Sequence, residues 1–213
     1  MIWPTAGGVT KYVLDRDNSE IAGLALKSML EYSKRFPRKS LLAHSMGNRV
    51  LRYAADSKFE FDNIFMVAAD VDADIFNQEC TGERWWTKLS QKLGREDRSE
   101  DGRNIINMLK DGGKVHVLHN HLDKALWISW LQKWFKSGTK KRLGSNGADL
   151  NALCKDSKGK VTNLDCQKEW LNKAKPWRRF EHTYQWDAEA LAYYGSQGSE
   201  DDGTCQLGLG EGD

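Results

Sequence analysis

The sequence predicts an α/β fold in which a mainly parallel sheet is covered by helices on both faces. Short apolar runs typical of buried strands alternate along the chain with segments whose apolar residues recur at helical spacing. With 213 residues and 39% hydrophobic residues, the chain suits one globular domain and is too apolar for wholesale disorder. We expect this domain to span residues 1–194.

The first part of the chain predicts a short extended segment over residues 1–3 and then a helix from about Ser19 to Phe36. In the helix, apolar residues recur at spacings of four and three: Ile21, Ala25, Met29, Tyr32 and Phe36. This period predicts one buried helix face. Pro37 ends the helix.

Strands and helices then alternate. An apolar strand is expected over residues 40–43, a helix over 46–55, and a strand buried on both faces over 64–69. A short helix over residues 72–76 follows.

The second half of the chain predicts fewer helices and strands than the first half. A third strand is expected over residues 115–118, and a helix over 124–135 with a stripe of three tryptophans, Trp127, Trp130 and Trp134. The charged stretch over residues 82–104 predicts an exposed, lid-like insertion. Residues 138–160 predict a loop, and the glycine-rich, acidic residues 195–213 predict a disordered tail.

The segment from Leu41 to Val50 places a single serine, Ser45, between a predicted strand and a predicted helix. Small residues, Ala43 and Gly47, lie two positions before and two positions after it. A serine nucleophile in a sharp, strained turn needs small neighbours, because larger side chains would collide with the adjoining strand and helix. The pattern predicts a nucleophile; the alternative is that Ser45 only caps the helix.

Other residues are candidates for contact with a substrate. The backbone N–H of Met46 begins the helix after the serine and is the expected donor to a developing oxyanion. His44, before the serine, and Trp85 and Trp86, in the lid-like insertion, are candidate substrate-binding residues.

A serine nucleophile needs a base, and the base needs an acid that orients it. Asp123 follows the predicted strand over residues 115–118, and His182 is the only histidine after it. Acid and then histidine is the chain order that such a turn predicts. Three alternatives stay open: Asp123 as a helix cap, His182 as an ordinary exposed histidine, and Asp70, which directly follows the strand over residues 64–69, as the acid.

Several segments are similar to those of one bacterial family: residues 3–7, Tyr12, Asp15, residues 43–50, residues 68–72, Phe76, residues 123–126, Ser129 and residues 142–144. On these motifs, residues 2–145 resemble the α/β-hydrolases of domain of unknown function 900. Residues 182–184 resemble the histidine segment of that family. The resemblance implies an α/β-hydrolase fold and an esterase- or lipase-like activity without a cofactor, and it implies no particular substrate.

The resemblance also implies that family members begin with further strands, one of which supplies a second oxyanion N–H. Because this chain begins inside the strand that ends at Trp3, we expect an N-terminally truncated domain with its first strands missing. Loss of one such donor costs about 100- to 1,000-fold in rate. The expected reaction is hydrolysis of a small-molecule or lipid-like carboxylic ester through an acyl-enzyme on Ser45, with activity impaired by the truncation.

Two other functions stay open. A truncated domain can keep the fold and act as a non-catalytic binding module. A zinc-dependent hydrolase would use the cluster of His116, His119, His121 and Asp123, although Lys124 stands where the metallo-β-lactamase-like pattern has a further histidine. We expect no metal.

The composition argues against a nucleic-acid-binding protein and against a membrane-spanning one. The chain carries 32 basic and 30 acidic residues, a balance that does not favour nucleic-acid binding. No apolar stretch is long enough to span a membrane, and residues 1–20 contain no signal peptide. The compartment, cytoplasmic or periplasmic and secreted, and the oligomeric state stay open. Cys154 and Cys166 are expected to be free thiols, with a disulfide between them as the alternative.

Overall fold

The computed structural model describes residues 12–56, 58–77, 103–127, 141–173 and 181–198. These residues form a sheet of four parallel strands in the order β1-β2-β3-β4. The strands are β1 (Ser40–His44), β2 (Phe61–Val67), β3 (Leu109–His119) and β4 (Val161–Asp165). The predicted α/β fold with a parallel sheet is confirmed.

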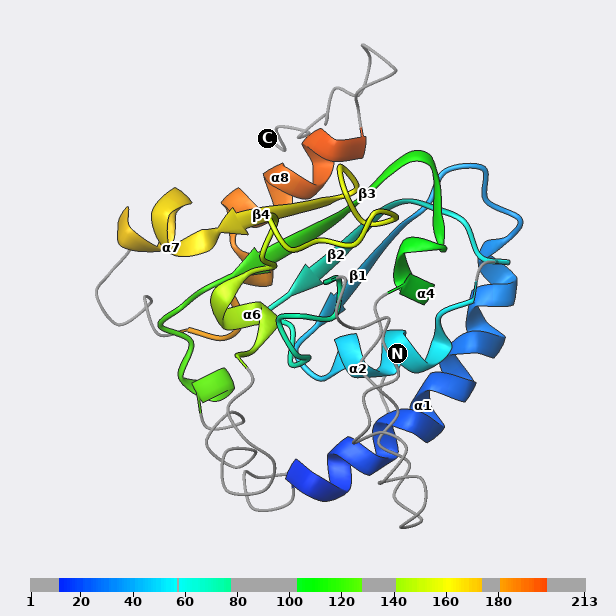
Figure 1. Cartoon of the computed structure of the whole chain (residues 1–213), viewed down its shortest axis with the longest axis horizontal. Helices are drawn as coiled ribbons and strands as arrows, with labels where there is room; N and C mark the ends of the chain where they lie inside the picture. The colour runs from blue at the N-terminus through cyan, green and yellow to red at the C-terminus, as the bar shows by residue number, and fades with distance from the viewer. Residues whose placement is uncertain (1–11, 57, 78–102, 128–140, 174–180, 199–213) are drawn as a thin grey trace, which may run out of the picture.

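Helices cover both faces of this sheet. Helices α1 (Tyr12–Ser33) and α2 (Gly47–Ala54) lie on one face, and α8 (Ala188–Gly198) lies on the other (Figure 1). Short helices lie in the connections: α4 (Arg103–Ile106) between β2 and β3, and α6 (Leu143–Asn146) between β3 and β4. After β4 come α7 (Cys166–Glu169), η3 (Leu171–Lys173) and η5 (Tyr184–Trp186), which precede α8.

Strand β2 explains why two hydrophobic cores form. Successive side chains of a strand point to opposite faces, so a strand covered on both faces is apolar at every position. Ile64 and Met66 pack with Leu51 of α2, whereas Phe65 and Val67 pack with Ala190 of α8. The continuous apolar run thus joins two cores across one sheet.

The carboxyl ends of the four strands meet at one edge of the sheet. His44 pairs with Val67, Val67 with Leu118, and His119 with Asp165. Residues that follow these positions are therefore brought together although they are far apart in the chain. In open parallel sheets, ligands bind at this edge.

The apolar stripe predicted to face the core from the first helix is exposed. Ile21 and Tyr32 are each 69% exposed, and Met29 is 54% exposed. A different face of α1 is buried: Ala22 and Leu30 are at most 5% exposed, and Leu26 packs against the core. On this side, a Cβ atom added to Gly23 would lie 2.4 Å from Cβ of Tyr53 on α2. Ala22, Leu26 and Leu30 also recur at a spacing of four, so two faces of this helix have an apolar period, and the predicted face was wrong.

The structure differs from the predicted elements at three further places. Residues 72–76 form turns rather than a helix, held by bridges at Asp72 and Asn77. The predicted loop over residues 138–160 contains α6, and β4 follows it where no strand was predicted. Helix α8 includes residues 195–198, which were assigned to the disordered tail.

Some predictions lie outside the described residues. These are the extended segment over residues 1–3, Trp85 and Trp86 with the lid-like insertion up to residue 102, Trp130 and Trp134, and residues 199–213. Cys154 and Cys166 are described, and both are buried free thiols, as expected. In the described part of the chain, no helix has the length and apolar character needed to cross a membrane.

Candidate active site

Ser45 occupies the turn between β1 and α2 with a φ angle of 52°. A non-glycine residue in this left-handed region is strained and is held there only by its surroundings. The backbone N–H of Ser45 donates to the Val67 carbonyl at 2.9 Å, which ties the turn to the neighbouring strand. Strand, strained serine and helix therefore follow one another as the sequence predicts.

Asn48 is a structural residue of this turn that the sequence did not identify. Its fully buried side chain donates from Nδ2 to the carbonyls of Ala43, at 3.0 Å, and Ser45, at 3.1 Å. The backbone N–H of Asp70 donates to the same Ser45 carbonyl at 3.2 Å. The turn is thus fixed by its own helix and by the loop after β2.

Asp123 and His182, 59 residues apart in the chain, form a hydrogen-bonded pair. The Oδ2 atom of Asp123 lies 2.7 Å from Nδ1 of His182. Asp123 is buried, and its other oxygen, Oδ1, accepts from the backbone N–H groups of Ala125 (3.0 Å) and Leu126 (3.1 Å). Asp123 thus both caps the helical residues after it and pairs with His182, so the two contacts do not exclude each other.

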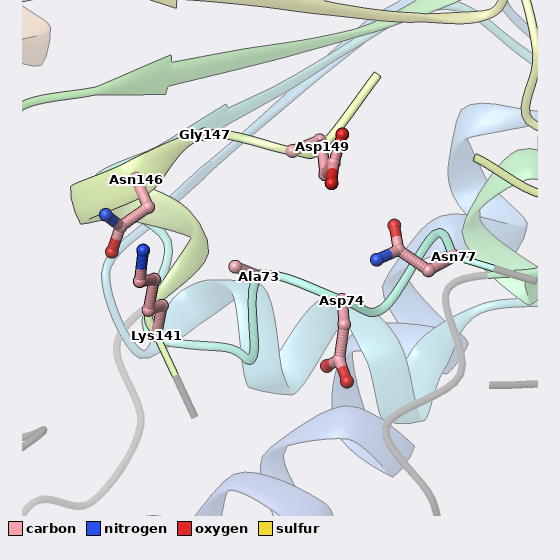
Figure 2. Close-up of a pocket in the computed structure, with 8 residues that line it drawn as sticks. Ala73, Asp74, Asn77, Lys141, Asn146, Gly147 and Asp149 are labelled. Carbon is pink, nitrogen blue, oxygen red and sulfur yellow. The ribbon is translucent and has the colours of Figure 1, made fainter. Parts of the chain in front are cut away.

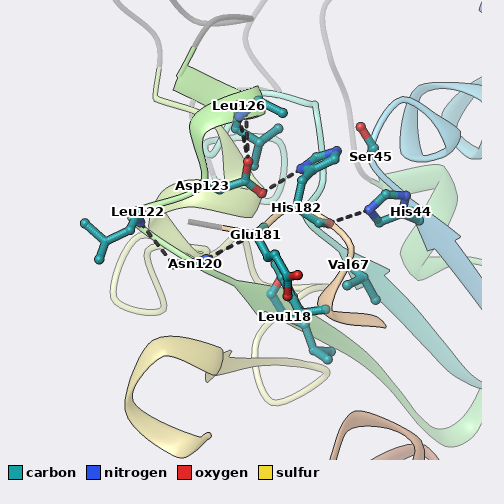
Figure 3. Close-up of polar contacts among 12 residues, drawn as sticks. His44, Ser45, Val67, Leu118, Asn120, Leu122, Asp123, Leu126, Glu181 and His182 are labelled. Atoms are coloured by element: carbon teal, nitrogen blue, oxygen red, sulfur yellow. Dashed lines mark hydrogen bonds and ion pairs between the residues drawn. The ribbon is translucent and has the colours of Figure 1, made fainter. Parts of the chain in front are cut away.

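The imidazole of His182 lies between Asp123 and Ser45 (Figure 3). In the described residues, no hydrogen bond joins Oγ of Ser45 to this ring, as in many ligand-free sites whose catalytic hydrogen bonds tighten only around substrate. The loop of His182 is held by neighbouring side chains: Nδ2 of Asn120 donates to the Glu181 carbonyl at 3.2 Å, and the Tyr184 hydroxyl donates to the Leu118 carbonyl at 3.1 Å.

His44, a predicted substrate-binding residue, contacts the protein itself. Its Nε2 atom lies 2.8 Å from the carbonyl oxygen of His182. Burial lowers the pKa of His44 and so favours its neutral form.

Asp70, the alternative acid, has a different partner. Its Oδ1 atom forms an ion pair with Nε of Arg142 at 3.2 Å, and Nη1 of Arg142 contacts Asp72 at 3.1 Å. All three side chains are buried. These ion pairs link the loop after β2 to the segment before α6, which agrees with a role for Asp70 as a loop anchor.

The backbone N–H of Met46, the predicted oxyanion donor, lies at the start of α2 directly after Ser45. Met46 is the N-cap residue of α2, and in the described part of the chain its N–H donates to no carbonyl or side chain. The N-terminus of α2 also carries partial positive charge toward Ser45.

The four residues of the alternative zinc site do not converge. His116 donates from Nε2 to Asn63 and contacts the Tyr193 hydroxyl beneath α8, His121 is exposed, and Asp123 binds His182. Among the described residues, no group of three or more His, Cys, Asp or Glu side chains is arranged to hold a metal ion.

A polar pocket of about 400 Å³ lies between the loop after β2 and the residues around α6 (Figure 2). Asn77 and Asp149 point into it, and Lys141 and Asn146 lie at its wall. Its lining includes none of Ser45, Asp123 and His182. The pocket is therefore separate from the candidate site.

The fold and the site define a class of protein. A parallel sheet flanked by helices carries a strained serine after β1, an aspartate after β3 and a histidine after β4, all at the carboxyl edge; this is the architecture of the α/β-hydrolases.

The chain belongs to the family described as "Alpha/beta hydrolase of unknown function (DUF900)", whose model matches residues 1–172. The matched residues include Ser45 and Asp123, whereas His182 lies beyond them. No curated protein and no solved structure matches the chain.

Proposed function

We propose that this α/β-hydrolase family member hydrolyses carboxylic esters through an acyl-enzyme on Ser45. The hydrogen bond between Asp123 and His182 is the observation that carries the proposal, because it pairs an acid with a histidine 59 positions away in the chain, as a base and its orienting acid require. The strained conformation of Ser45 beside the same imidazole supports it.

The hydrogen bond also indicates which nitrogen acts as the base. A carboxylate only accepts, so Nδ1 of His182 carries a hydrogen, and in the neutral imidazole Nε2 is then the nitrogen with a free lone pair. In the proposed reaction, Oγ of Ser45 bonds to the ester carbonyl carbon while its proton passes to Nε2 of His182.

The remaining steps return the enzyme to its starting state. The Met46 N–H stabilises the oxyanion, and the imidazolium gives its proton to the departing alkoxide as the carbon–oxygen bond breaks. Water then repeats the attack on the acyl-enzyme, with His182 again accepting the proton. No cofactor enters these steps.

A fluorophosphonate probe tests the nucleophile. We expect wild-type protein to gain one adduct, mapped to Ser45, and Ser45→Ala to gain none, as measured by intact and peptide mass. Ser40→Ala, at an exposed position of β1, the strand before Ser45, is the matched control and should react like wild type. Equal labelling of wild type and Ser45→Ala would refute the nucleophile, and an unreactive folded wild type would favour the non-catalytic module.

A further inference from the structure

His44 makes one contact that links the two ends of the candidate site. The residue directly precedes Ser45, and its Nε2 atom lies 2.8 Å from the main-chain carbonyl of His182. A carbonyl oxygen has no hydrogen to give, so Nε2 must be the donor. The two imidazole rings lie with their centroids 4.7 Å apart and their planes tilted by 54°.

We propose that His44 is a positioning residue, which fixes the proposed general base His182 relative to the nucleophile by donating a hydrogen bond to its carbonyl. The inference rests on the proposed function. This contact holds the loop over residues 181–184 from the end of β1, next to Ser45, whereas Leu118, Asn120 and Asp123 hold the same loop from β3 and the residues after it.

The origin of each contact matters because the two reacting residues are attached to different parts of the sheet: Ser45 follows β1, whereas His182 lies in the loop before η5. Contacts from β3 orient the imidazole toward its acid, but they do not fix its distance from Ser45. His44 and Ser45 share one peptide bond, so a hydrogen bond from His44 couples the base directly to the strained turn. A displacement of about 1 Å between reacting groups can cost about 100-fold in rate.

The proposal separates His44 from a substrate-binding role. Its donor nitrogen is already used by the His182 carbonyl, so it is not free to bind an acyl or alcohol group. A positioning residue should affect the rate of the chemical step more than the binding of substrate.

The test replaces His44 with Gln or with Met, two side chains of similar length. Gln presents an amide N–H about where Nε2 lies, whereas Met has a similar shape and no donor. We expect His44→Met to lower the rate constant for fluorophosphonate labelling and kcat for p-nitrophenyl acetate by about 10- to 100-fold with little change in KM. We expect His44→Gln to recover most of this loss.

The controls separate this inference from the proposed function. His121→Leu removes an exposed histidine and should label like wild type. If wild type itself does not label at Ser45, the proposed function fails. If wild type labels and His44→Met labels equally fast, or if His44→Gln is impaired as much as His44→Met, only the positioning role fails.

A measurement on wild-type protein keeps the inference testable should the variants not fold. Long-range nitrogen–proton NMR spectra distinguish the two neutral histidine tautomers. The expected result is a hydrogen on Nε2 of His44. A neutral His44 with its hydrogen on Nδ1 would overturn the inference.

Discussion

Asp123 shows how one buried side chain serves both the fold and the candidate site. One carboxylate oxygen caps the helical residues 124–127, and the other accepts from His182. The cap holds the carboxylate by backbone groups, so its second oxygen is presented in one direction. A pre-oriented carboxylate positions a partner ring at a lower entropic cost than a mobile one.

Asp123→Asn is expected to lower kcat for an ester substrate by about 10⁴-fold. The amide can donate to Nδ1 of His182, which places the ring hydrogen on Nε2 and removes the base. Stopped-flow or steady-state hydrolysis, with circular dichroism to confirm folding, measures the loss.

Asp70→Asn is the comparison that decides between the two acids. Because Asp70 pairs with Arg142 rather than His182, we expect lower stability and, per folded molecule, activity within about tenfold of wild type. The reverse outcome, an inactive Asp70→Asn beside an active Asp123→Asn, would place the acid after β2.

At the scale of elements, the loop after β2 and helix α6 meet backbone against backbone. A Cβ atom added to Gly144 would lie 2.2 Å from the Ala69 nitrogen and 2.3 Å from the Ala68 carbonyl carbon. Hydrogen bonds cross this contact: Gly144 N–H donates to the Ala69 carbonyl, and Asn120 N–H donates to that of Gly144, both at 2.9 Å. The contact therefore joins the chain after β2 to the chain after β3.

Gly144→Ala is expected to destabilise the fold by about 3 kcal/mol, because backbone atoms cannot move aside for the added methyl group as a side chain can. Urea unfolding measures the change. Gly195→Ala, in α8 with open space around it, is the matched control and should be neutral or raise stability by up to about 1 kcal/mol. Similar stability of the two variants would contradict the close contact.

At the scale of the whole molecule, a polar cluster joins α8 to the sheet. His116 of β3 donates to Asn63 of β2 at 3.0 Å and contacts the Tyr193 hydroxyl of α8 at 2.9 Å, while Asn63 donates to the Gln197 carbonyl at 3.0 Å. Burial, with a smaller effect of Lys114, lowers the pKa of His116 to about 4. The cluster is therefore built around a neutral imidazole.

Acid is expected to weaken this connection. Since the pKa is about 4 in the folded state and 6.5 by default, the unfolded chain binds more protons between these values. The contribution of neutral His116 to the free energy of unfolding is fully present above pH 6.5. It falls by about 3 kcal/mol as the pH drops to 4.

His116→Gln provides the comparison, because it keeps a polar side chain that does not titrate. Urea unfolding at pH 7, 5.5 and 4.5 should show a steeper loss of stability in wild type than in the variant. Burial also lowers the pKa values of His44 and His119. Because both residues titrate in wild type and in the variant, their contributions cancel in the difference between the two pH profiles. Parallel pH profiles would contradict a buried neutral His116.

The sequence by itself determined the elements whose patterns are local. The apolar run of β2, the small residues around Ser45 and the chain order of serine, aspartate and histidine each depend on neighbours along the chain, and together they indicated the fold and the candidate triad. Catalytic roles for Ser45, Asp123 and His182 stay predictions until the probe experiments are done. The sequence left the buried face of α1 ambiguous, because Ala22, Leu26 and Leu30 recur at the same helical spacing as the larger residues of the exposed stripe.

Only the tertiary structure decided which partner each polar side chain takes. Asp70 and Asp123 both follow a buried strand, and nothing local distinguishes them; Arg142 pairs with one and His182 with the other. The contact of His44 with the His182 carbonyl spans 138 positions of the chain. These long-range pairings depend on the register of the parallel strands, which brings their carboxyl ends to one edge of the sheet. Packing across the whole sheet fixes that register.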